Sequence, residues 1–483
     1  METEMPAKHE PSLKLFLTGL MISLLVGALD TSIITTAMPK IISNLGGMAY
    51  YIWPFTIYLL TSTISIIASG KLSDIFGRRK VLLAGIGIFV ASSILCGFSQ
   101  NMLELTLFRG LQGLGGGAII TTPFIVVAEV FPARDRGKYT GILSSVFGFA
   151  SVLGPLLGGL VTDMIGWRWV FFINIPIGIM AVYMLMSYFP NLEEVVKEAN
   201  IDYNGIVSLT VSLSSLFIAL TFVKNGSISW VVVALIAFSV LMLGVFLHSE
   251  KNAKEPVLPL HLFKNSVFNI SSIEMFLSNA VMYCGTVYIP LFMEDVKGFS
   301  ASSSGIFLTS MLVSLTLASI ITGQLISRTG TYKKFAVLGF SLLAASMLLF
   351  SSVGTGTWIG TVVMYAALLG LGSGMMYPIF NAAAQNAVSK RELGVVTASM
   401  QFFRNIGSTV ALPIFGVIVN LTVNMNASTE SVAPSLMSAG IHNVFLSGLI
   451  ISVVGLGICF LLQDVFLSSR LESGDSEKRV TGK

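Results

Sequence analysis

Long apolar segments separated by short polar loops constrain this sequence more than any other feature. Each segment is about 20 or more residues long, which is the length an α-helix needs to cross the hydrocarbon core of a bilayer. The composition agrees, since 54% of the 483 residues are hydrophobic and 11% are charged, against roughly 25% charged residues in ordinary soluble domains. The mean hydropathy is +0.83. The sequence therefore predicts an all-α integral membrane protein.

Fourteen spans can be placed along the chain. The first follows a short polar tail and is too long for a signal-peptide core of about 7 to 15 residues, so we expect it to remain as a spanning helix. The predicted spans are residues 13–39, 50–72, 81–100, 103–128, 138–162, 168–189, 203–223, 229–248, 267–292, 302–327, 334–353, 357–386, 394–423 and 438–465.

A charged loop that occurs twice divides the spans into two related halves. Residues 70–80 read GKLSDIFGRRK, and a degraded copy, GQLISRTGTYKK, begins 253 residues later at Gly323. Six spans with their loops need about 190 residues at roughly 30 each, so this offset leaves room for two inserted spans. We therefore predict an N-terminal six-helix bundle at 1–190, linkers and an inserted helix pair at 191–266, a C-terminal six-helix bundle at 267–466 and a cytoplasmic tail at 467–483.

Basic residues are distributed unevenly between the two sides of the predicted membrane. The loops after odd-numbered spans hold only Lys40, Arg168, Lys224 and Lys297, whereas most other lysines and arginines fall in loops after even-numbered spans. The positive-inside rule then places both termini in the cytoplasm. The formal net charge of +4 is too small to indicate a nucleic-acid partner.

Residues 70–80 match the G-x-L-x-D-x-x-G-R-[RK] loop of the major facilitator superfamily, and four further motifs resemble its fourteen-span drug/proton antiporter branch, the EmrB/QacA type. The further motifs are Leu29-Asp30-Thr31 with Pro39, the RGLQG run at 109–113, Gly148 with Gly154-Pro155 and Gly158-Gly159, and the run from Trp167 to Gly178. The second-half copy of the loop departs from the pattern, because it lacks the acid and has Ser327 nearby. The resemblance implies two six-helix bundles around a central cavity and export by alternating access.

Two charged residues of the first half lie deep in apolar spans. A charge there costs about 2.5 to 3.5 kcal/mol on insertion scales, so such residues face an aqueous cavity or a partner. We predict that Asp30 is the proton-coupling carboxylate; the alternative is a structural polar contact. Arg109 shares a helical face with Gln112, which we expect in the substrate cavity, and the resemblance makes Arg109 a proton-relay or carboxylate-gating residue. An anchor to backbone carbonyls remains the alternative for Arg109.

The motifs also suggest which residues control opening. The predicted cytoplasmic gate consists of Gly70, Asp74, Gly77, Arg78, Arg79 and Glu129, in which Glu129 pairs with Arg78 or Arg79. Small residues let helices approach closely, and a proline bends a helix. The resemblance associates the fifth-span motif of Gly154, Pro155, Gly158 and Gly159 with exporters.

The second half contributes a smaller set of candidates. Glu274 lies one or two turns into the ninth span, where it is either a cation-attracting cavity carboxylate or an interfacial carboxylate that reaches the cytoplasmic surface. The predicted polar lining or gate of the second bundle comprises Asn381, Gln385, Gln401 and Arg404.

These observations favour a proton-coupled multidrug transporter of the cell membrane that exports amphipathic, cationic compounds. An exporter of one physiological lipid or metabolite is the alternative. A non-transporting receptor is less favoured, because it would need a soluble signalling domain that neither the predicted linkers nor the predicted tail is long enough to hold. The partners expected are small-molecule substrates, protons and the lipid bilayer, with the chain as a monomer. No metal-ligand cluster or nucleophile-base pair stands out, so we expect no enzymatic activity, no metal and no cofactor.

The charge asymmetry of the loops makes a direct prediction about topology. A reporter enzyme that is active only in the cytoplasm, fused after Lys483, should be active, because an even number of spans returns the chain to the side where it began. The same reporter inserted after Lys224, in a predicted external loop, is the control and should be inactive. Activity of a periplasmic or extracellular reporter at Lys483 would contradict the fourteen-span model.

Overall fold

The computed structural model describes residues 10–131, 133–190, 203–222, 229–253, 258, 260–354, 356–388, 393–423 and 433–462, and these contain helices and no β-strand. The helices of the first half are α1 Glu10–Leu45, α2 Trp53–Phe76, α3 Arg78–Phe98, α4 Met102–Val130, α5 Ala133–Met164, α6 Trp169–Phe172 and α7 Asn174–Tyr188. The middle pair is α8 Tyr203–Thr221 and α9 Trp230–Asn252. The second half has α10 Ser266–Leu291, α11 Ala301–Thr329, α12 Lys333–Phe350, α13 Ile359–Asn386, α14 Leu393–Val423 and α15 Pro434–Cys459. Short turns η1 Met48–Tyr50, η2 Leu260–Lys264 and the π-helical η3 Phe292–Val296 join some of them.

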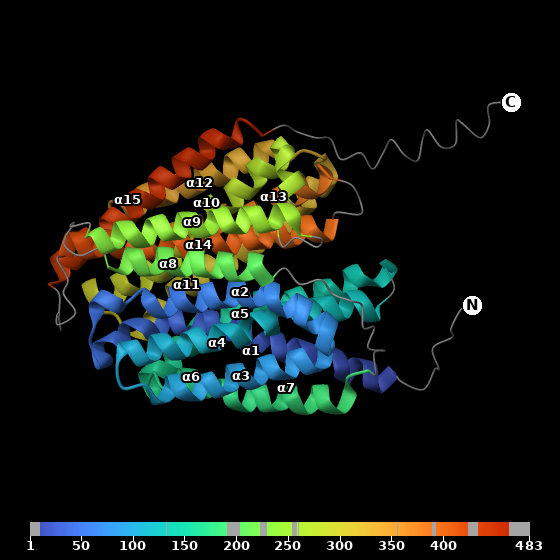
Figure 1. Cartoon of the computed structure of the whole chain (residues 1–483). Helices are drawn as coiled ribbons and strands as arrows, with labels where there is room; N and C mark the ends of the chain where they lie inside the picture. Colours follow the sequence, from blue (N-terminus) through green and yellow to red (C-terminus); the bar gives the residue numbers. More distant parts are fainter. Residues whose placement is uncertain are drawn as a thin grey trace, which may run out of the picture.

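The helices lie side by side in two groups (Figure 1). In this view α1 to α7 form the lower group and α12 to α15 with α10 the upper one. α8 packs against α9 and also contacts α2 and α14. At the contact with α2, the rings of Trp53 and Phe217 meet edge to face at 6.0 Å. The middle pair therefore lies against both halves instead of within either one.

Twelve helices in the described part of the chain are long and apolar enough to cross a membrane. Eleven belong to the two halves and one is α9. Of the two remaining predicted spans, 50–72 forms α2, which is not among the twelve, and 203–223 contains the shorter apolar helix Asn204–Leu220. That helix is shorter than the roughly 20 residues that a span requires. The predicted all-helical membrane fold is confirmed, whereas the predicted count of fourteen spans is not.

Side chains at the helix starts explain several of the boundaries. Asn101 caps α4 by accepting from the backbone N–H of Glu104 at 2.9 Å, and the Glu104 carboxylate accepts from the N–H of Gln100 at 2.8 Å. This reciprocal pair satisfies two amide groups that the helix itself leaves free. Between α2 and α3 the chain reverses at a single residue, Gly77, whose φ of 91° is in the region that only glycine adopts readily.

The two halves meet closely where α5 runs antiparallel to α11. Gly159 of α5 lies so near α11 that a Cβ there would be 2.5 Å from the carbonyl oxygen of Ala301, and a Cβ on Gly305 would overlap the carbonyl oxygen of Pro155. Such backbone contact between helices requires small residues. At the end of α5, Asp163 accepts from the backbone N–H of Ser302 at 2.8 Å.

A second contact joins the halves at the same end of the molecule. The Tyr51 hydroxyl, just before α2, donates to the carbonyl oxygen of Val287 near the end of α10 at 3.0 Å. Gly416 of α14 faces Ile52, with an added Cβ 3.2 Å from that side chain. The end of the bundle where α5 ends and α2 begins is thus closed by direct helix packing, and the loop between α2 and α3 lies at the opposite end.

This close packing predicts that a larger residue at Gly305 opens the closed end. Gly305→Val would place methyl groups against the Pro155 carbonyl, and forced overpacking costs roughly 1 to 3 kcal/mol, enough to shift a two-state equilibrium by about 5- to 150-fold. Spin labels on Met164 and Ser300 should report a longer distance in the variant, because both flank the contact. Gly244→Val on α9, where a Cβ would meet nothing within 4 Å, is the control. An unchanged distance in Gly305→Val would contradict the packing argument.

Candidate functional site

An ion pair is buried in the middle of the first half. Arg109 of α4 donates from Nη1 to Oδ2 of Asp30 on α1 at 2.5 Å. The two residues are 1% and 2% exposed. Taking such ions out of water costs several kcal/mol each, and only close pairing with further hydrogen bonds offsets it. The two charged residues singled out in the sequence are therefore each other's partner.

Neutral side chains from two more helices complete the cluster. The other carboxylate oxygen of Asp30, Oδ1, accepts from Nε2 of Gln112 at 2.8 Å and from Nδ2 of Asn174 at 3.0 Å. Gln112 and Asn174 also donate to the hydroxyl of Ser93 on α3, at 2.8 and 3.3 Å. Four helices, α1, α3, α4 and α7, thus hold one carboxylate that accepts from three donors.

The aromatic ring of Tyr58 on α2 covers the arginine. The guanidinium carbon of Arg109 lies 4.1 Å from the centre of the ring, a cation–π geometry. The Tyr58 hydroxyl is buried and has no hydrogen-bond partner among the described residues. The Tyr58 ring therefore covers one side of the cluster, and its hydroxyl is available for a further hydrogen bond.

The fifth-span motif connects this cluster to the other half. A Cβ on Gly154 would overlap the Ser32 hydroxyl of α1, and one on Gly158 would lie 2.6 Å from the carbonyl oxygen of Ile33. Pro155 and Gly159 are on the opposite side of α5, against α11. α5 therefore lies between α1, which carries Asp30, and α11 of the second half. It contacts both helices through backbone atoms.

The predicted gate residues gather at the far end of the first half. Arg78 donates from Nε to Oε2 of Glu129 at 3.0 Å, and its Nη1 donates to the carbonyl oxygen of Gly70 at 3.3 Å and to the Ser73 hydroxyl. Arg79 donates to the carbonyl oxygen of Met186 at the end of α7, at 2.6 Å. These bonds join the ends of α2, α3, α4 and α7. The side chain of Asp74 lies outside the described part of the structure.

The polar residues predicted for the second half form two small groups. Gln385 of α13 donates to the Thr397 hydroxyl of α14 at 2.8 Å and lies 3.5 Å from the Asn381 side chain. One turn further along α14, Gln401 donates to Asn405 at 3.3 Å. The guanidinium of Arg404 lies over the ring of Tyr377 on α13, 5.2 Å from its centre.

Glu274 lies apart from these groups. It is fully buried, and its Oε1 accepts from the Cys459 thiol of α15 at 3.3 Å, while Oε2 has no partner among the described residues. Cys284 of α10 also contacts α15, with its sulfur 3.6 Å from the carbonyl oxygen of Val444. Position 274 is therefore on the side of α10 that packs inside the second half. It lines neither a surface nor an open cavity wall.

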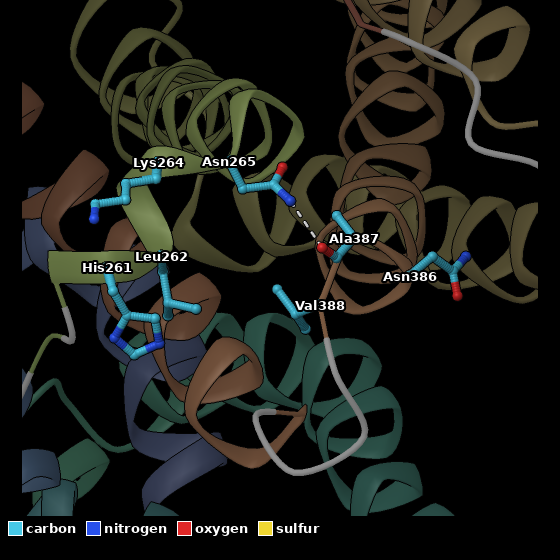
Figure 2. Close-up of a pocket in the computed structure, with 7 residues that line it drawn as sticks. All are labelled: His261, Leu262, Lys264, Asn265, Asn386, Ala387 and Val388. Atoms are coloured by element: carbon cyan, nitrogen blue, oxygen red, sulfur yellow. Dashed lines mark hydrogen bonds between the residues drawn. The ribbon is translucent and has the colours of Figure 1, made fainter.

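A shallow pocket of about 480 Å³ opens at the start of α10 and the end of α13. Figure 2 shows His261, Leu262 and Lys264 on one side of it and Ala387 and Val388 on the other, with Asn386 pointing away. Asn265 closes the pocket by donating to the carbonyl oxygen of Ala387 at 2.7 Å. None of the residues predicted from sequence lines this pocket.

Sequence reasoning missed three members of the first-half cluster. Asn174 belongs to the motif that runs from Trp167 to Gly178, but a motif alone does not say which helix it faces. Ser93 and Tyr58 carried no signal, because an isolated hydroxyl in an apolar span is common. A search for a polar residue at the start of each apolar helix would have found Asn174, which is the first residue of α7.

Comparison with known proteins agrees with this architecture. The family model described as "Major Facilitator Superfamily" matches residues 20–412. The multidrug transporter protein MdtP of Bacillus subtilis is 39% identical over 88% of this chain and 78% of its own, and multidrug resistance protein 3 of the same organism is 32% identical over 90% and 85%. A bacterial homologue of the human lysosomal transporter Spinster, in an inward-facing and unoccupied conformation, superposes with a TM-score of 0.67 at 13% identity, covering 95% of this chain and 98% of its own.

The buried ion pair predicts a large asymmetry between single and double substitutions. Arg109→Met leaves the Asp30 carboxylate buried without a counter-charge, and removing one partner of such a pair costs about 3 to 5 kcal/mol. Thermal unfolding of the detergent-solubilised protein should show a strongly lowered midpoint for Arg109→Met. The double variant Asp30→Asn with Arg109→Met should recover most of the loss, since no buried charge remains. Equal midpoints for wild type and Arg109→Met would show that the pair contributes nothing to stability.

Proposed function

The chain belongs to the Major Facilitator Superfamily, and we propose that it is a proton-coupled efflux transporter of amphipathic small molecules in the cell membrane. The two Bacillus relatives bear names of multidrug transporters, which supports efflux. We further propose the fourteen-span drug/proton antiporter branch, in which α2 and α8 join the twelve candidate spans. Both termini would then be cytoplasmic.

The ion pair of Asp30 and Arg109 is the main observation that supports the proposed proton coupling. A carboxylate buried in a membrane span is the kind of group that relays protons in transporters. In this structure Asp30 accepts from Arg109, Gln112 and Asn174, and a proton that binds it removes the negative charge that holds Arg109. Protonation would release Arg109 and loosen the junction of α1, α4 and α7.

Alternating access follows from where the halves touch. If the loop between α2 and α3 is cytoplasmic, the closed end formed by α5, α11 and Tyr51 is extracellular. Reorientation then requires separation of α5 from α11 at that end. We propose that Gly70, Asp74, Gly77 and Arg79 act with the pair of Arg78 and Glu129 as the cytoplasmic gate at the other end.

Proton binding and reorientation share one structural link. α1 carries Asp30, and two residues later Ser32 packs against Gly154 of α5. The opposite side of α5 is the contact with α11. A shift of α1 on protonation would therefore press directly on the helix that joins the halves, and this couples the proton to the conformational equilibrium without contact between proton and substrate.

The path of the substrate is assigned to the second-half residues Asn381, Gln385, Gln401 and Arg404 together with the first-half cluster. The sequence analysis favoured cationic compounds and offered Glu274 as one candidate that could attract them. This carboxylate is buried against Cys459, so it is not placed to attract a cation from the path. We therefore do not propose a cationic substrate.

Asp30→Asn should abolish proton-coupled export, because the amide keeps the size and two hydrogen-bonding atoms but cannot take up a proton. In proteoliposomes that contain a trapped pH-sensitive dye, addition of a transported compound should move protons through the wild type and at least tenfold more slowly through the variant. Exchange of labelled for unlabelled compound across the same vesicles, which needs no net proton movement, should continue.

Glu104→Gln is the matched control for that experiment. It also converts an acid to an amide on α4, and glutamine can keep the N-terminal cap that Glu104 completes. It should transport protons at the wild-type rate. Wild-type proton movement in Asp30→Asn would place the coupling group elsewhere and leave Asp30 a structural residue.

A further inference from the structure

Asp30, Arg109, Glu274 and Arg404 are charged residues about two turns or more inside their membrane-spanning helices, and three of these four are accounted for. Asp30 and Arg109 neutralise each other, and Glu274 is sealed between α10 and α15. Arg404 of α14 remains. In the described part of the chain no carboxylate pairs with it, since the ion pairs found there are those of Arg78 with Glu129 and Arg109 with Asp30.

The surroundings of Arg404 are polar and aromatic but not acidic. Its guanidinium lies over Tyr377, 5.2 Å from the ring centre, and Nη1 is 3.5 Å from the Gln401 side-chain oxygen. That distance is beyond the usual hydrogen-bond range. The side chain is half-buried, so its five N–H donors are only partly used. A cation inside a membrane protein normally has a counter-charge or faces water.

Arg404 lies on a helix that touches both halves. α14 packs against α10 and α13 of the second half and also contacts α2 of the first half. Tyr377, whose ring lies beneath the guanidinium, belongs to α13.

The backbone at this point is held firmly. Asn279 of α10 donates to the carbonyl oxygen of Arg404 at 2.6 Å. Two residues beyond Asn405, Gly407 lies against Phe276 so closely that a Cβ there would overlap its carbonyl oxygen. A guanidinium carried by such a fixed backbone is suited to bind a planar group in one orientation.

We propose that Arg404 binds a carboxylate on the transported amphiphile, with Gln401 and Asn405 as amide donors and the ring of Tyr377 against its apolar part. This inference rests on the proposed efflux function and specifies its substrate class as anionic amphiphiles. Guanidinium and carboxylate match in shape and form two parallel hydrogen bonds. A cationic head group at the same place would meet a like charge and no carboxylate.

The test compares three fluorescent probes that differ only in their head group. They are 11-(dansylamino)undecanoic acid, its methyl ester and the corresponding trimethylammonium compound. The purified full chain in phosphatidylcholine nanodiscs is titrated with each. The wild type should bind the acid at least tenfold more tightly than the ester, and the ammonium compound more weakly than the ester.

Substitutions then test whether Arg404 is responsible for the preference for the acid over the ester. Arg404→Gln should weaken acid binding about tenfold, to the level of the ester, while ester binding stays unchanged and shows that the site is folded. Arg404→Lys should retain part of the preference, because it keeps the charge without the planar fork. Arg328→Gln, which removes an equal charge from the exposed end of α11, should bind all three probes as the wild type does.

Several outcomes would overturn the inference. They are no binding of the acid by the wild type, equal affinity for acid and ester, tightest binding of the ammonium compound, or an acid preference that survives Arg404→Gln. The titration involves no gradient and no transport. Acid binding without export in vesicles would therefore refute the efflux function and leave the anion site intact, whereas export without an acid preference would refute the anion site alone.

Discussion

The ion pair between Asp30 and Arg109 is the interaction on which the rest of the first half depends. Neither charge could be buried alone, because the desolvation of an unpaired ion costs several kcal/mol. Their pairing requires α1 and α4 to meet at one depth, and the second oxygen of Asp30 brings in α7 through Asn174. A polar centre inside an apolar bundle thus specifies which helices are neighbours. Apolar packing alone would allow more arrangements of the helices.

The same constraint reaches the second half through α5. Gly154 and Gly158 let α5 approach α1, and Pro155 and Gly159 let it approach α11. Helices in contact through backbone atoms have few alternative arrangements, because small shifts bring main-chain atoms into overlap. The two halves therefore have a small number of packed states instead of a continuous range, which is the property that alternating access requires.

The sequence predicted the helical membrane fold, the two charged residues and the close-packing motif, because hydropathy and glycine spacing are local signals. The count of fourteen spans stays a prediction, because twelve of the described helices are long and apolar enough to cross a membrane and α2 and α8 are not among them. The sequence did not predict that Asp30 and Arg109 bind each other, that Asn174 and Tyr58 join them, or that Glu274 turns into the second half. Helical periodicity shows which residues share a face, but the neighbour of that face is decided by tertiary packing.

For a proton-coupled exporter, which is the function proposed for this chain, the charge of the substrate determines which part of the proton gradient can drive export. A monovalent cation that leaves in exchange for one proton moves no net charge, so the membrane potential adds nothing. An anion that leaves for one proton moves two elementary charges in the direction favoured by a potential negative inside, at about 2.3 kcal/mol per charge per 100 mV. An anion site at Arg404, as proposed, would therefore suit a transporter driven by voltage as well as by pH. In such a transporter a proton at Asp30 would be coupled to the substrate through the helix packing of α1, α5 and α11 and not through competition for one site.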